Sequence, residues 1–555
     1  MATSAYFLTL LNLLIIILAS STSTFVASTR TYSSLSASRC AILTSSCSNT
    51  RHPDLCFSSL ASAPVHVSLN TQMDVIKASI NVTCTSVLRN IAAVNKALST
   101  RTDLTPRSRS ALKDCVETMS TSLDELHVAL AELDEYPNKK SITRHADDLK
   151  TLLSAATTNQ ETCLDGFSHD DSEKKVRKTL ETGPVRVEKM CGNALGMIVN
   201  MTETDMASAT NAVNTEGGSS GSWPIWMKGG DRRLLQAGTT VTPNVVVAAD
   251  GSGKYRRVSE AVAAAPSKSS KRYVIRIKAG IYRENVEVPK DKTNIMFVGD
   301  GRSNTIITGN KNVVDGSTTF NSATVAVVGQ GFLARDITFQ NTAGPSKHQA
   351  VALRVGADLA AFYRCDFLAY QDTLYVHSNR QFFINCLVVG TVDFIFGNSA
   401  AVFQNCDIHA RRPNPGQKNM LTAHGRTDPN QNTGIVIQKS RIAATSDLQS
   451  VKGSFGTYLG RPWKAYARTV IMQSTISDVV HPAGWHEWDG NFALNTLFYG
   501  EHKNSGAGSG VNGRVKWKGH KVISSDAEAA GFTPGRFIAG GSWLGSTTFP
   551  FTLGL

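Results

Sequence analysis

The sequence contains no apolar run long enough to cross a membrane. No stretch of the 555 residues reaches the roughly 18 consecutive apolar residues that a transmembrane helix needs. Ten cysteines are too few for a small scaffold held together by disulfides. Because 41% of the residues are hydrophobic and only 18% are charged, the composition also excludes an intrinsically disordered chain. At about 150 residues per domain, we expect roughly two to four folded domains.

The sequence also lacks the signatures of several common kinds of site. Its histidines show no metal-ligand spacing, and no Ser–His–Asp arrangement accompanies them. Residues 250–254 resemble a phosphate-binding loop, but Ala248 and Tyr255 stand where that motif needs glycine and serine or threonine, so we interpret the segment as a tight turn. No nucleic-acid-binding motif is present. We therefore expect no metal, no cofactor and no nucleic acid.

The positive charge of the chain is confined to its C-terminal part. Lys and Arg number 57 against 44 Asp and Glu, a net charge of +13. Residues 1–236 hold 23 basic and 23 acidic side chains, whereas residues 237–555 hold 34 and 21. Such an excess is typical of proteins that bind nucleic acid, a membrane surface or an acidic polymer. Since no nucleic-acid-binding motif accompanies the charge, it does not indicate nucleic acid here.

The N-terminus has the features of a secretory signal. Residues 7–18 form a 12-residue apolar run followed by small residues, and we predict a signal peptide over 1–27. An uncleaved anchor is the alternative, since no Lys or Arg precedes the run. Two Asn-x-Thr sequons, at Asn81 and Asn200, predict glycosylation and agree with secretion.

Residues 38–213 carry helical periodicity. Apolar residues recur at steps of three and four over about 73–98, 115–133, 142–156 and 187–201, which predicts an all-α four-helix bundle. The spacing of Cys47 and Cys56 suits a local hairpin disulfide. The segment contains no catalytic cluster, so it is either a plain folded domain or one with a regulatory or folding role.

A linker follows the predicted bundle. Residues 214–240 are rich in Gly and Ser, which favours a flexible connection. Within it, the sequence Arg232-Arg233-Leu234-Leu235 places a dibasic pair at a domain boundary. Proteolysis concentrates in accessible loops of this kind, so we predict processing here.

From residue 241 to 555 the periodicity changes to that of short strands. A phrase beginning at Phe362 returns at Phe383 and again at Phe403. A repeat of about 20 residues built from short strands predicts a parallel β-solenoid with one coil per repeat. Equivalent positions on successive coils then lie about 4.8 Å apart.

This repeat predicts a polar column. Gln349, Gln371 and Asp393 are evenly spaced along the sequence at about the length of one coil, which would place them one above another, and Asp372 follows Gln371 directly. Asp393 lies in an apolar strand, so its charge needs a cationic partner from elsewhere in the chain. The column could equally be a structural ladder whose side chains only satisfy one another.

Four motifs in this region resemble those of plant pectin methylesterases. They are 344–354, with Gly-Pro and His-Gln-Ala-Val-Ala-Leu-Arg; 370–375, Tyr-Gln-Asp-Thr-Leu-Tyr; 390–397, Gly-Thr-Val-Asp-Phe-Ile-Phe-Gly; and 459–463, Leu-Gly-Arg-Pro-Trp. The N-terminal bundle resembles the pectin methylesterase inhibitor-like pro-region of that family. The dibasic site resembles the family's processing site for subtilisin-like proteases.

The resemblance implies a right-handed parallel β-helix that hydrolyses the methyl esters of pectin. By motif position, Asp393 would be the nucleophile and Asp372 the general acid and base. Gln349 and Gln371 would stabilise the oxyanion, and Arg461 would orient Asp393. Substrate would also contact Gln349, Arg461, Trp463 and Thr319. The neighbouring Thr318 is the alternative to Thr319 at this position.

The resemblance also implies a pattern of disulfides. Cys47–Cys56 and Cys115–Cys163 would be the pairs of the inhibitor-like domain, with Cys191 free, while the pairing of Cys40 and Cys84 stays open. Cys386–Cys406 would link neighbouring coils and leave Cys365 free. The implied mature protein is a monomeric enzyme of the cell wall, restrained beforehand by its pro-region or by a separate inhibitor protein.

Two other functions remain open at this point. Two carboxylates on a β-helix could serve a glycosidase, and an idle catalytic part could serve a wall-binding or inhibitor protein. The aromatic segment 485–488 could line a sugar groove or could pack against the solenoid.

Overall fold

The computed structural model describes residues 36–62, 69–167, 171–213 and 242–555. The predicted signal peptide and the dibasic processing site at 232–235 lie outside these residues. Within the part that is described, no helix combines the length and hydrophobicity needed to cross a membrane. Asn81 and Asn200, the predicted glycosylation sites, lie exposed on helices.

The N-terminal part is helical, as the periodicity predicted. Its helices are α2 (Ala37–Ser48), α3 (Pro53–Ala61), α4 (Gln72–Thr100), α5 (Pro106–Glu135), α6 (Ile142–Asp165), α7 (Asp171–Leu180) and α8 (Thr182–Val213). The four long helices α4, α5, α6 and α8 pack around one apolar core. Local sequence sets their starts: Thr71 and Asp74 form a capping box at α4, and Thr105 caps α5 directly before Pro106.

Two disulfides hold the helical part together. Cys115–Cys163 joins α5 to α6. Cys47–Cys56 joins α2 to α3, so its cysteines lie in two short helices rather than in the non-helical hairpin that we expected. Cys40, Cys84 and Cys191 are free thiols.

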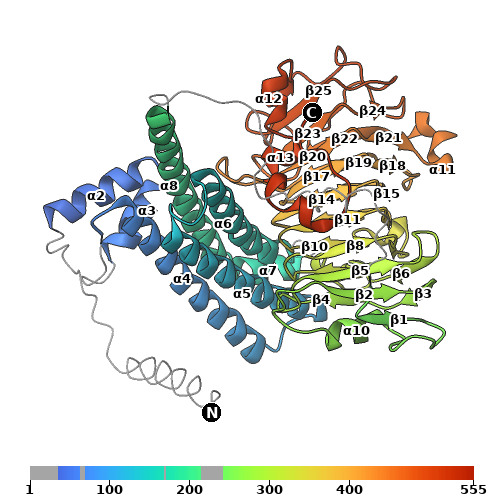
Figure 1. Cartoon of the computed structure of the whole chain (residues 1–555), viewed down its shortest axis with the longest axis horizontal. Coiled ribbons are helices and arrows are strands. Elements are labelled where there is room, and N and C mark those ends of the chain that lie inside the picture. Colours follow the sequence, from blue (N-terminus) through green and yellow to red (C-terminus); the bar gives the residue numbers. More distant parts are fainter. Residues whose placement is uncertain (1–35, 63–68, 168–170, 214–241) are drawn as a thin grey trace.

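Residues 242–555 form a parallel β-helix with strands in three sheets (Figure 1). The 11-stranded sheet contains β1 (Val245–Val247), β2 (Tyr273–Ile277), β5 (Ile295–Gly299), β8 (Leu333–Arg335), β11 (Ala360–Tyr363), β14 (Arg380–Ile384), β17 (Ala400–Gln404), β20 (Gly434–Gln438), β23 (Arg468–Met472), β25 (Phe498–His502) and β26 (His520–Val522). The 8-stranded sheet contains β3 (Gly280–Arg283), β6 (Thr305–Gly309), β9 (Thr338–Asn341), β12 (Asp366–Leu368), β15 (Leu387–Gly390), β18 (Asp407–Ala410), β21 (Arg441–Ala444) and β24 (Thr475–Ile476). The 7-stranded sheet contains β4 (Val286–Val288), β7 (Val325–Val327), β10 (Leu353–Val355), β13 (Leu374–Val376), β16 (Ile395–Gly397), β19 (Asn419–His424) and β22 (Thr457–Pro462).

The sequence repeat corresponds to the stacking of coils. Phe362, Phe383 and Phe403 are paired in register, and their rings stack in the interior with centroids 4.9 and 4.5 Å apart. Just after them, the chain turns from the 11-stranded to the 8-stranded sheet. The repeat thus combines an interior aromatic position with a turn position.

This turn uses a left-handed backbone conformation in successive coils of the repeat. The residues involved have φ between 51° and 53° and are Arg364, Asn385, Asn405, Lys439 and Gln473. Asparagine adopts this conformation more readily than most residues, which explains its recurrence here.

The predicted disulfide between Cys386 and Cys406 is not formed in the structure. Both are buried free thiols, as is Cys365. The repeat brings all three cysteines into one ladder, and the central thiol of Cys386 hydrogen-bonds with both of its neighbours. The resemblance therefore predicted correctly that Cys386 and Cys406 are neighbours. In the structure the Cys386 thiol contacts both Cys365 and Cys406 and is bonded covalently to neither.

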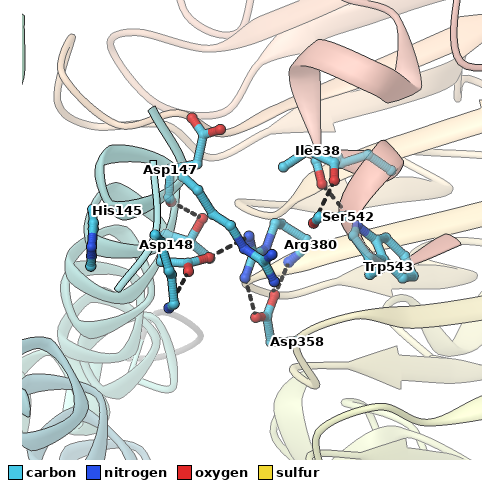
Figure 2. Close-up of polar contacts among 12 residues, drawn as sticks. His145, Asp147, Asp148, Asp358, Arg380, Ile538, Ser542 and Trp543 are labelled. Carbon is cyan, nitrogen blue, oxygen red and sulfur yellow. Dashed lines mark hydrogen bonds and ion pairs between the residues drawn. The ribbon is translucent and has the colours of Figure 1, made fainter. Parts of the chain in front are cut away.

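The β-helix is covered on two sides. The C-terminal segment, with α12 (Asp526–Ala530) and α13 (Pro534–Phe537), packs Trp543 and Phe549 on the outer face of the 11-stranded sheet. The long helices lie along another side of the coils (Figure 1). There, Asp148 of α6 contacts Arg380 of β14 at 2.8 Å, and Arg380 also binds Asp358 at 2.7 Å (Figure 2).

The Phe383 ring should be a main contributor to the stability of the β-helix, because it stacks between two other rings and is fully buried. We expect Phe383→Ala to lower the free energy of unfolding by about 3–5 kcal/mol, measured by urea unfolding followed by circular dichroism. Phe492→Ala, at a residue that is 41% exposed, is the control and should stay within about 0.5 kcal/mol of the parent. Equal losses in the two variants would contradict the role of the stack.

Candidate active site

A pocket of about 310 Å³ opens on the 7-stranded sheet, where the helical part meets the β-helix. It contains each residue that the sequence placed in the site. The β-helix residues that line it are Thr319, Phe320, Gln349, Gln371, Asp372, Tyr375, Asp393, Phe396, Ala423, Arg461, Trp463 and Trp488.

The register of the 7-stranded sheet builds the pocket floor. Tyr375, Phe396, Ala423 and Arg461 are successive partners across β13, β16, β19 and β22. Since neighbouring strands lie about 4.8 Å apart, this row of four side chains extends about 14 Å along the helix axis. The small Ala423 leaves room between the Phe396 ring and the Arg461 guanidinium.

Arg461 supplies the cation that the sequence required for Asp393. Its Nε donates to Asp393 Oδ1 at 2.8 Å and its NH2 donates to Oδ2 at 2.6 Å. Only 6% of Asp393 is exposed, so this two-point pairing offsets the cost of burying the carboxylate. The same guanidinium lies 4.3 Å from the ring centre of Trp488, which fixes it from the other side.

Asp372 is the second buried carboxyl in the pocket. It is 7% exposed, and its pKa is raised well above the usual value, mainly by burial and then by the negative charge of Asp393. The charge of Arg461 opposes this shift in pKa without cancelling it. The two carboxyl groups therefore have different surroundings: Asp393 is paired with a guanidinium, and burial favours the neutral form of Asp372.

The predicted polar column is present in a modified form. The Ala350 N–H donates to Gln371 O at 3.3 Å, which sets Gln349 beside Gln371. The Asp372 N–H donates to Val392 O at 3.0 Å, which sets Asp372, not Gln371, beside Asp393. The Gln349 amide is therefore beside the Gln371 amide, and the Asp372 carboxyl is beside the Asp393 carboxyl. The prediction assumed evenly spaced coils, but the coil that ends at Asp393 is shorter.

Both aspartates have left-handed backbone conformations, with φ of 62° at Asp372 and 51° at Asp393. Such conformations are strained for residues other than glycine and persist where the surroundings impose them. Gln349 and Gln371 are partly buried, and neither side-chain amide has a hydrogen-bond partner among the described residues. Both amides therefore remain able to donate to a bound molecule.

The two tryptophans of the aromatic segment 485–488 lie in different surroundings, one in the core and one in the pocket. Trp485 is 1% exposed and stacks on Tyr499 with centroids 4.1 Å apart, so it belongs to the core. Trp488 is 37% exposed and lines the pocket. Because this segment is a loop, side chains do not alternate between buried and exposed as they do along a strand. The sequence therefore could not show which tryptophan is buried.

Thr319, which the sequence predicted to contact substrate, lines the pocket, whereas the adjacent Thr318 contacts the helical part. The Thr318 hydroxyl donates to Asp114 of α5 at 2.5 Å. Tyr375 and Phe396, which sequence reasoning did not select, stack with centroids 4.2 Å apart and form the apolar floor with Phe320. Both rings lie within three residues of Asp372 or Asp393 in the same motifs, and this proximity could have identified them from the sequence.

The end of α6 also lines this pocket, through Thr162, Asp165 and Gly166. The Thr162 hydroxyl lies 2.8 Å from Nε2 of His377, whose ring packs against Tyr375 and Phe320 of the pocket floor. Nearby, the amide of Asn398 donates to Thr158 at 2.9 Å. The helical part therefore forms one wall of the pocket that contains the two aspartates.

Opposite charges meet where α5 and α6 contact the β-helix. The acidic partners come from the helices and the basic ones from the β-helix: Asp124 with Lys290 (3.2 Å), Glu117 with Arg354 (3.6 Å), Asp148 with Arg380 (2.8 Å), and Asp165 with Lys464 (3.1 Å). This arrangement uses the excess positive charge of residues 237–555.

Comparisons with known families and proteins agree with this architecture. The Pectinesterase family matches residues 244–541, and the Plant invertase/pectin methylesterase inhibitor family matches residues 41–197. Pectinesterase 1 of Citrus sinensis is 70% identical over 520 residues, covering 93% of this chain and 89% of the relative. Pectinesterase/pectinesterase inhibitor U1 of Solanum lycopersicum is 68% identical over 529 residues, covering 94% and 90%. The solved structure of pectin methylesterase from carrot has 77% identity and a TM-score of 0.57, covering 57% of this chain and 100% of that one.

The raised pKa of Asp372 predicts a pH-dependent gain in stability when this carboxyl is removed. Above about pH 4 the unfolded chain releases the proton that folded Asp372 retains, so Asp372 increasingly destabilises the folded state as the pH rises. We expect the free energy of unfolding of Asp372→Asn, relative to that of the parent, to increase as the pH rises from 4 to 8, measured by urea unfolding at each pH. A difference that does not change with pH would contradict the shift.

Proposed function

Because this chain belongs to the pectinesterase family and carries an inhibitor-like domain before its β-helix, we propose that Asp393 is the nucleophile with which it hydrolyses the methyl esters of pectin. The chain is a carboxylic ester hydrolase with pectin methylesterase activity. The observation that carries the proposal is the two-point pairing of Asp393 with Arg461 beside a second carboxyl of raised pKa.

In the first half of the reaction, the Asp393 carboxylate attacks the carbonyl carbon of a galacturonate methyl ester. The carbonyl oxygen becomes an oxyanion, to which the amides of Gln349 and Gln371 donate hydrogen bonds. As the C–O bond to the methoxy group breaks, neutral Asp372 transfers its proton to that oxygen and methanol leaves. The product is an anhydride between Asp393 and the galacturonyl group.

In the second half, the Asp372 carboxylate accepts a proton from water. The resulting hydroxide attacks the galacturonyl carbonyl, the anhydride bond breaks, and the Asp393 carboxylate is released with a free galacturonate. Asp372 is then protonated again, as the next cycle requires. Arg461 holds Asp393 in position through two hydrogen bonds, while Trp463, Trp488 and Thr319 contact the sugar chain.

The helical part restrains the enzyme until it is removed. Its support is that Thr162, Asp165 and Gly166 lie in the pocket that substrate needs. Cleavage at Arg232–Leu235 by a subtilisin-like protease then separates the two parts after secretion. The mature, monomeric β-helix acts in the cell wall, with Asn81 and Asn200 glycosylated on the part that is discarded.

Replacement of the nucleophile should abolish activity without loss of the fold. We expect Asp393→Asn and Asp393→Ala to lower kcat for methanol release by on the order of 10⁴–10⁶-fold, because the proposed anhydride cannot form without the Asp393 carboxylate. Gln371→Ala should lower it by on the order of 10²–10³-fold. Asp407→Asn, which removes an exposed partner of Arg441, is the control and should keep full activity. Full activity of Asp393→Ala, or shortening of the pectin chain by the parent protein, would overturn the assignment.

Removal of the helical part should activate the enzyme. The carrot structure corresponds to the β-helix alone, so a fragment of residues 241–555 is expected to fold. The comparison protein is a full-length chain that cannot be cut because both Arg232 and Arg233 are replaced. We expect kcat/KM on methylated pectin to be about 100-fold higher for the fragment, as it would be if the pocket of the uncut chain were closed in about 99 of 100 molecules. Equal specific activities would contradict the restraint.

A further inference from the structure

Lys464 is a cation at the edge of the catalytic pocket that the proposed reaction does not use. It follows β22 closely and lies beside Trp463, with its Nζ 5.2 Å from the ring centre. Trp463 itself lines the pocket with Asp372 and Asp393. The ammonium group thus borders the surface on which a sugar would lie.

Both ion-pair partners of Lys464 come from the helical part. Its Nζ lies 3.1 Å from Asp165 Oδ1 and 3.4 Å from Glu161 Oε2. Asp165 also lines the catalytic pocket, so a carboxylate of α6 occupies a place in the groove that substrate would use. The side chain of Lys464 is only 22% exposed in this arrangement, and both partners leave when the helical part is removed.

The substrate offers a replacement of the same chemistry. Each unit of pectin carries at C6 either a methyl ester, which is uncharged, or a free carboxylate. An ammonium group pairs with the carboxylate and gains little from the ester, so it distinguishes the two. The unit being hydrolysed has its C6 group at Asp393, whose guanidinium partner is Arg461. Lys464, beyond Trp463, is left for a different unit of the same chain.

We propose that Lys464 binds the free carboxylate of a galacturonate unit next to the one being hydrolysed, and that Asp165 and Glu161 occupy this subsite in the uncut chain. The proposal rests on the proposed function of the same pocket. It makes Lys464 a specificity-determining residue: the enzyme works faster beside units that have already lost their esters. The acidic end of α6 is then an internal substitute for de-esterified pectin.

The test compares two substrates in the 241–555 fragment, which has no helical part. For the parent fragment and for Lys464→Gln, kcat/KM is measured on fully methylated pectin and on partly de-esterified pectin. We expect the ratio of the second value to the first to fall about tenfold in Lys464→Gln, since a hydrogen-bonded pair with a charged group is lost on one substrate alone. Lys464→Arg should restore most of the ratio.

The matched control is Lys439→Gln. It removes one positive charge from a turn on another side of the β-helix, at the left-handed position that Gln473 occupies in the next coil. The backbone therefore tolerates glutamine there, and the substrate ratio should not change. A similar fall in the control would mean that overall charge, not a subsite, sets the preference.

A second measurement uses unesterified trigalacturonate as a competitive inhibitor. Its inhibition constant should rise about tenfold in Lys464→Gln and not in Lys439→Gln. If Lys464 serves only to hold the helical part, neither the ratio nor the inhibition constant will change in the fragment, and the proposal is overturned. A parent fragment that releases no methanol from either pectin would instead overturn the proposed function.

Discussion

The stacking of successive coils in register is the constraint on which the site depends. Parallel pairing across β13, β16, β19 and β22 aligns Tyr375, Phe396, Ala423 and Arg461 in one row. The loops just before β13 and β16 then bring Asp372 and Asp393 together, both in strained backbone conformations. A carboxylate in such a place is stable only with a partner, and Arg461 reaches it from two coils further along. The fold thus fixes the chemistry of the pocket before any substrate arrives.

Charge organises the relation between the two parts of the chain. The β-helix holds the whole excess of positive charge, and α5 and α6 present carboxylates to it. Pectin becomes more anionic as its esters are removed, and we propose that Lys464, one of these basic groups, also binds it. In the proposed scheme the helical part and the de-esterified product bind the same basic groups, which would connect restraint before processing with substrate selection afterwards.

Sequence periodicity predicted most of the fold. It did not predict the details of the site that depend on local contacts between coils or between domains. The change from helical steps of three and four to a longer repeat of short strands identified the bundle and the β-helix, since both are one-dimensional patterns. The same counting gave a column of Gln349, Gln371 and Asp393, but the last coil of that column is shorter than the first, and Asp372 takes the place beside Asp393. The thiols of Cys386 and Cys406 are adjacent without forming a disulfide, and Cys365 lies on the other side of Cys386. The contacts of Thr162 and Asp165 with the pocket could not be predicted, because docking of one domain on another leaves no period in either sequence.

The central claim is that Asp393 forms a covalent bond with the galacturonyl group. The most direct measurement is to quench the 241–555 fragment with sodium borohydride while it turns over methylated pectin, and then to analyse its peptides by mass spectrometry. Reduction of an aspartyl anhydride yields homoserine, so homoserine is expected at position 393 with substrate present and not without it. An unmodified Asp393 in a fragment that releases methanol throughout, with homoserine at position 372 or nowhere, would contradict the claim.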